Sequence, residues 1–121
     1  MAKKTVDEII ALVVAKVKTI TVISNRIYHQ YPPVTATYPC ISYGVLGIQP
    51  YKQDDETIPM EVVLSFDLFG TSPVFSLMNE LDTKLKDLTL KVELEGMREI
   101  DDPLNPQVHR VNVQYRFIWN Y

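Results

Sequence analysis

Hydrophobic residues alternate with polar ones between residues 60 and 69, and then change to a helical spacing after a short break. Strict alternation is typical of a strand with one buried face. The next segment repeats apolar residues at steps of three and four, which predicts an amphipathic helix over residues 74–88. Gly70 breaks the strand, Ser72 is expected to cap the helix, and Pro73 to occupy its first turn. The apolar strand positions are Met60, Val62, Leu64, Phe66 and Leu68, and the helical ones are Val74, Met78, Leu81, Leu85 and Leu88.

A second amphipathic helix is predicted at the start of the chain, over residues 6–17. Thr5 and Glu8 have the spacing of a capping box, in which each residue satisfies a free backbone N–H of the other. Most residues of the apolar stripe are β-branched, which disfavours an isolated helix, so packing must stabilise it. A membrane-surface helix is the less favoured alternative, because the polar face carries only Lys16 and Lys18 as basic residues.

Three further extended segments are predicted, at residues 26–28, 40–46 and 91–100. In the second, Ile41, Tyr43 and Val45 share one face, and Cys40, Ser42 and Gly44 share the other. In the third, Val92, Leu94 and Met97 are expected to be buried, and Gly96 to mark a bulge. Residues 47–59 are predicted to form a long polar connection that is mobile or used for contact.

The last strand is predicted over residues 108–119, with its apolar residues facing one way and its polar residues the other. This order of elements predicts an α+β fold, with a mostly antiparallel sheet of four to five strands and two amphipathic helices on one face. A single domain is expected over residues 1–121. The opposite sheet face would be polar, and two interpretations remain open: this face docks against copies of the chain, or it is simply solvated.

The strands at 60–69 and 108–119 have one antiparallel register that places both apolar sets inside and opposite charges outside. An intervening strand is the alternative. The predicted pairs are Phe66 with Val111, Leu64 with Val113, Val62 with Tyr115, Asp67 with Arg110, and Glu61 with Arg116.

Composition narrows the class of protein. The chain has 121 residues, 46% of them hydrophobic, with a net charge of −3 and one cysteine. That is enough apolar content for a core, and it offers no concentrated basic patch for duplex DNA. The longest apolar runs are too short to cross a membrane, and acidic residues follow the basic start, which does not fit a signal peptide. A single cysteine cannot form an internal disulfide.

The sequence contains no motif that is typical of a catalytic site. His29 and His109 lack neighbours at metal-ligand spacing, and Cys40 lacks activating residues, so a buried and slowly reacting thiol is expected. The acidic clusters at 54–56 and 101–102 lack the spacing of a calcium loop and are interpreted as solvated charge. We therefore predict no catalytic, cofactor-binding or metal-binding residues and expect a non-enzymatic binding or assembly module. A pocket lined by Tyr28, His29 and His109 would instead favour a small-molecule-binding domain or an unrecognised enzyme.

The order and spacing of four segments resemble the tail-terminator family of long-tailed phages, also called tail-completion or head–tail joining proteins. The resemblance covers nearly the whole chain. Its segments are the opening amphipathic helix, R-I-Y-H-Q-Y-P-P at 26–33 with Y-P-C-I-S-Y at 38–43, the strand and helix at 64–81, and D-D-P-L-N-P-Q-V-H-R-V-N-V-Q-Y-R-F at 101–117.

The resemblance implies a virion protein that forms a ring, typically of six subunits, on the head-proximal end of the tail tube. The ring would stop tube polymerisation and join the head connector, while DNA passes through its bore without base recognition. Its partners would be copies of itself, the tail-tube protein and the head connector, and no cofactor is implied. Another small phage neck or connector protein is the alternative.

Interface residues are predicted in the 47–59 connection and on the polar sheet face. Lys52 is also the expected first site of native cleavage by trypsin. The predicted residues are Tyr51, Lys52, Asp54, Asp55, Glu56, Glu61, Asp67, Arg110 and Arg116.

Overall fold

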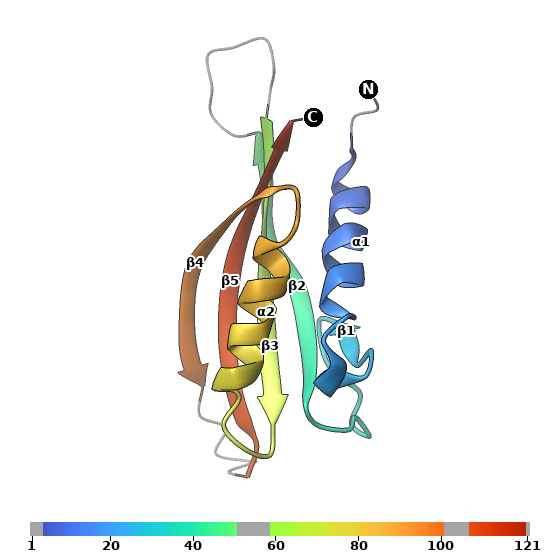
Figure 1. The fold of residues 1–121 in the computed structure, drawn as a ribbon, viewed down its shortest axis with the longest axis vertical. Coiled ribbons are helices and arrows are strands. Elements are labelled where there is room, and N and C mark those ends of the chain that lie inside the picture. The colour runs from blue at the N-terminus through green and yellow to red at the C-terminus, as the bar shows by residue number, and fades with distance from the viewer. Residues whose placement is uncertain (1–3, 51–58, 101–106, 121) are drawn as a thin grey trace.

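Two helices lie on one face of a five-stranded sheet (Figure 1). The structure is a computed structural model that describes residues 4–50, 59–100 and 107–120. It confirms the predicted α+β fold. The elements are α1 (Val6–Val17), a 3₁₀ turn η1 (Thr21–Ile23), β1 (Ile27–His29), β2 (Cys40–Pro50), β3 (Pro59–Gly70), α2 (Phe75–Lys86), β4 (Lys91–Ile100) and β5 (His109–Asn120).

The strand order in the sheet is β1-β2-β3-β5-β4. Each neighbouring pair is antiparallel except β1 with β2, which run parallel. β3 pairs directly with β5, so the alternative with a strand between them is wrong. The sheet is therefore mostly antiparallel, as predicted, and β3 and β5 form its centre.

The predicted register between β3 and β5 is wrong by two residues. Phe66 lies opposite Val113, and Val111 lies opposite Leu68. The observed register pairs both strands along their whole length, from Gly70 with His109 to Pro59 with Asn120. Because side chains alternate with period two, a shift of two leaves every residue on its predicted face.

The helix α1 is held by its cap and by the core. The Thr5 hydroxyl accepts a hydrogen bond from the Glu8 backbone N–H, and the Glu8 carboxylate accepts one from the Thr5 N–H, each at 3.2 Å. This confirms the predicted capping box. Ile9, Val13 and Val17 are fully buried, so packing offsets the weak helix propensity of the β-branched residues.

The start of α2 differs from the prediction. Its N-cap residue is Val74, without a side-chain cap, and Ser72 and Pro73 precede the helix. Val74 is buried, and a β-carbon on Gly70 would lie 2.7 Å from its side chain. Gly70 therefore allows Val74, the N-cap residue of α2, to pack against the end of β3.

Two edge regions also depart from the prediction. Residues 47–50 belong to β2, which continues past a register shift between Val45 and Gly47, so the predicted connection is shorter than 47–59.

Leu94 and Met97 of β4 are exposed by 43% and 52%, although they were expected to be buried. Both lie on the helix face, but β4 is an edge strand and α2 covers it only partly. The bulge predicted at Gly96 is confirmed as a register shift between Leu94 and Gly96.

Cys40 is fully buried, as predicted, and it is a free thiol. Burial raises the pKa of the thiol, and the nearby Arg26 charge lowers it by a smaller amount. The thiolate is the reactive form, so slow labelling of Cys40 by thiol reagents stays our prediction.

Tyr115 of β5 joins the sheet to α2 through a hydrogen bond that its hydroxyl donates to the Asp82 carboxylate at 2.8 Å. Burial, and then the hydrogen bond and charge of Asp82, raise the pKa of Tyr115 well above its ordinary value of 10.0.

Replacing Tyr115 by Phe is expected to lower the free energy of unfolding by about 1–2 kcal/mol at neutral pH, because the hydrogen bond to a charged acceptor is lost. The folded state holds the phenolic proton more tightly than the unfolded chain. The contribution of this hydrogen bond to stability is therefore complete below pH 10.0 and falls as the pH rises above that value. Urea unfolding at several pH values should show the two proteins converging above that pH; a constant difference would contradict this.

Candidate assembly surface

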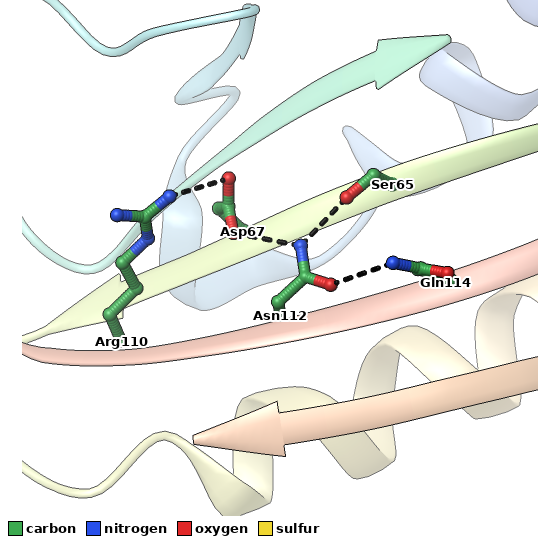
Figure 2. Close-up of polar contacts among 5 residues, drawn as sticks. All are labelled: Ser65, Asp67, Arg110, Asn112 and Gln114. Atoms are coloured by element: carbon green, nitrogen blue, oxygen red, sulfur yellow. Dashed lines mark hydrogen bonds and ion pairs between the residues drawn. The ribbon is translucent and has the colours of Figure 1, made fainter. Parts of the chain in front are cut away.

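A ladder of polar side chains crosses the sheet face opposite the helices, between β3 and β5 (Figure 2). Asn112 donates hydrogen bonds to Ser65 Oγ at 2.7 Å and to Asp67 Oδ1 at 2.9 Å. Arg110 Nη2 donates to Asp67 Oδ2 at 3.1 Å, and Gln114 donates to Asn112 at 3.3 Å. Alternation places these residues on the same face, and direct pairing of β3 with β5 brings them within reach. The result is a connected row of bonded polar groups.

A second cluster lies further along the same face, where Arg116 contacts two carboxylates. Its Nε atom is 3.1 Å from Glu61 Oε2 and 2.7 Å from Glu95 Oε1. The Glu61 side chain is only 4% exposed, and it also accepts a hydrogen bond from Gln49 of β2. A carboxylate this buried needs a cation close by, so Arg116 is essential to the cluster.

Both guanidinium groups of β5 are therefore engaged within the sheet. Arg110 is paired with Asp67 and also lies over the Phe69 ring, with 5.3 Å from Cζ to the ring centroid. Phosphate binding uses basic side chains that can form new contacts. This part of the face has its positive charge already neutralised, which disfavours tight binding of a nucleic-acid backbone.

The structure brings together the predicted interface residues of the sheet face. Asp67 with Arg110 and Glu61 with Arg116 form the predicted ion pairs, although diagonally, because Asp67 lies opposite Asn112 and Glu61 opposite Ile118. Whether they form an interface stays a prediction. The remaining predicted residues lie outside the described part of the chain: Tyr51, Lys52, Asp54, Asp55 and Glu56.

The two histidines do not share a site. His29 ends β1 and packs against Tyr43 at 5.1 Å between ring centroids, whereas His109 begins β5, with β2 and β3 lying between. Three surface cavities of about 180, 340 and 130 Å³ have linings that include neither histidine nor Tyr28. These cavities therefore give no support to the alternative of a small-molecule-binding domain with a pocket at these three residues.

Within residues 4–50, 59–100 and 107–120, no three His, Cys, Asp or Glu side chains are grouped closely enough to hold a metal ion. Over the same described ranges, neither helix has the length and apolar content needed to span a membrane.

The sequence reasoning missed two exposed apolar edges of the sheet. One is the second half of β2, where Val45, Leu46 and Ile48 are exposed, and the other is β4 with Leu94 and Met97. The run G-V-L-G-I at 44–48 is the signal that was available, but the predicted strand ended at residue 46 and the polar connection began at residue 47. Glu95 as the second carboxylate of Arg116 was also missed, because the bulge in β4 changes the alternation there.

Comparison with known proteins identifies the fold but no sequence family. No protein-family model matches the chain, and no curated protein matches it. Among solved structures, the chain is similar to one in a structure titled "Virion of native gene transfer agent (GTA) particle". The TM-score is 0.56 at 9% identity, and the alignment covers 90% of this chain and 92% of that chain. At this identity the match shows a shared fold.

Proposed function

We propose that this chain is a non-enzymatic structural protein of a phage-like virion, which closes the head-proximal end of the tail tube as a ring. The observation that carries the proposal is the fold shared with a chain of a gene transfer agent virion along nearly the full length of both. Within that class, the order of segments resembles the tail terminators.

The two sheet edges support a ring. A closed ring of identical subunits needs two different complementary patches on each subunit. β4 and the second half of β2 lie at opposite sides of the sheet, and both carry exposed apolar side chains. We propose six subunits, from the family resemblance, with the tail-tube protein and the head connector as further partners.

The paired charges on the polar sheet face support passage of DNA without capture. Arg110 and Arg116 are already bound to carboxylates, so a bore that includes this face would hold few phosphate contacts and release DNA readily.

Negative-stain microscopy of the protein incubated with tail tubes tests the proposal. We expect a ring at one end of each tube and no further elongation when tube protein is added. Deleting the gene should give overlong or headless tails beside normal DNA-filled heads. Tails of normal length that still join heads would refute the proposal, and rings midway along tubes would indicate a different neck or tail component.

A further inference from the structure

The second half of β2 is an apolar strand edge without charged residues. β1 pairs with β2 only at Ile41–Tyr43, and within the described residues no strand pairs with the outer side of β2 beyond that point. Val45, Leu46 and Ile48 are 39%, 57% and 48% exposed. Natural proteins protect free edges with charged residues, prolines and bulges. Residues 44–50 contain no charged residue, although they include Pro50 and the register shift after Val45. This edge therefore has the character of a contact surface.

The opposite edge of the sheet carries a partly apolar groove. Its apolar lining comes from Met78 of α2, from Leu94 and Met97 of β4, and from Val113 and Tyr115 of β5, and the polar side chains of Asn79, Asp82 and Lys86 complete it on the α2 side. The groove has a volume of about 130 Å³. β4 pairs with β5 on one side, and among the described residues nothing pairs with its other side, although five of its ten residues are charged.

Strand direction and side-chain orientation make these two edges complementary. Each step β2–β3, β3–β5 and β5–β4 is antiparallel, so β2 and β4 run in opposite directions. A β4 strand beside the β2 edge of another copy would thus continue the antiparallel order. Val45 and Ile48 lie opposite the buried Leu64 and Val62, and Leu94 and Met97 lie opposite Tyr115 and Val113. Both exposed rows therefore lie on the helix face and would meet there.

We propose that the Gly44–Pro50 edge of one copy pairs with β4 of a second copy, and that its apolar side chains enter the groove between α2 and β4. The contact is heterologous, because each copy uses a different edge at each of its two neighbours. It extends the sheet and the core together from one copy to the next. That repeated contacts of this kind close into a ring, and how many copies the ring holds, rests on the proposed function.

Disulfide trapping tests the contact, with the native buried Cys40 retained in every protein. Six mixtures combine Val45→Cys, Leu46→Cys or Ile48→Cys with Leu94→Cys or Met97→Cys, and are oxidised at high concentration. We expect a disulfide-linked dimer in at least one mixture, in several-fold excess over each single variant alone, because a disulfide forms only between closely placed Cα atoms. Val22→Cys, with 47% exposure, replaces the β2 variants in control mixtures.

Three results would overturn the proposal. They are no excess in any of the six mixtures, equal yield with Val22→Cys, and dimers formed by Ile48→Cys alone, which would indicate a symmetric contact of β2 with itself.

A charge placed in the edge provides a second test without oxidation. Ile48→Lys should abolish ring formation at tube ends, whereas Val22→Lys, at nearly the same exposure, should retain it. Circular dichroism should show both variants folded, since both side chains are half exposed. Rings formed by Ile48→Lys would refute the edge contact and leave the tail-end function standing. Trapped dimers without binding to tubes would refute the function and leave the contact standing.

Discussion

Replacing Leu81 by Ala is expected to lower the free energy of unfolding by about 2–5 kcal/mol, which is the cost of removing a fully buried leucine side chain and leaving a cavity. Leu81 is 0% exposed and lies on the buried stripe of α2 with Leu77 and Leu85. The stripe packs into the core cluster that the sheet and α1 share. A loss of this size is a large part of the stability of a typical small domain, about 5–15 kcal/mol.

Leu94→Ala is the matched control, because it removes the same atoms from a leucine that is 43% exposed. It should change the free energy of unfolding by about 0.5 kcal/mol or less. Urea denaturation of the two variants and the wild type gives the comparison. Equal losses from the two substitutions would contradict the packing of α2 described here, and would mean that the β4 groove belongs to the core of the single subunit.

Replacing Arg116 by Met is expected to lower the free energy of unfolding by about 3 kcal/mol, which is the lower end of the range for breaking a buried ion pair. The substitution leaves Glu61 buried without its cation, and it leaves Glu95 without the same partner. The lower end applies because the Arg116 side chain is 32% exposed, so water offsets part of the loss.

Two further variants separate this charge effect from general disruption of the sheet. Arg110→Met should lower the free energy of unfolding by only about 1 kcal/mol. Its partner Asp67 is more exposed than Glu61, and it still accepts a hydrogen bond from Asn112. Combining Glu61→Gln with Arg116→Met should recover part of the Arg116 loss, since no buried charge at residue 61 then needs a partner. Equal effects of the two arginine substitutions, or no recovery in the double variant, would argue against a buried charge as the cause.

The outer sheet face is thus organised by pairing within the chain. Its central arginines are bound to carboxylates of the same subunit, which leaves them less available to an intermolecular partner. The apolar side chains at the two edges are exposed in the subunit. This division is the reason we expect copies to associate through the edges, as proposed above, with the polar face remaining hydrated.

The sequence by itself determined the elements and their faces. The period of two in residues 60–69 and 108–119 predicted which side chains share a face of the sheet, and the observed shift of two residues between β3 and β5 preserves that result. The Thr5 and Glu8 pair correctly predicted the start of α1. These features depend on local backbone geometry and on the periodic burial of apolar residues, both of which are present in the order of the residues.

Tertiary structure alone decided the neighbours and the edges. Strand order placed β4 outside β5, which left Leu94 and Met97 exposed although their spacing fits a buried row. The helix α2 begins after Val74, which packs closely against Gly70, and not after Ser72. The register let Asp67 reach Asn112 as well as Arg110, and the bulge in β4 brought Glu95 to Arg116. Each outcome depends on which segment lies beside another, and periodicity within one segment defines its faces without identifying its neighbour.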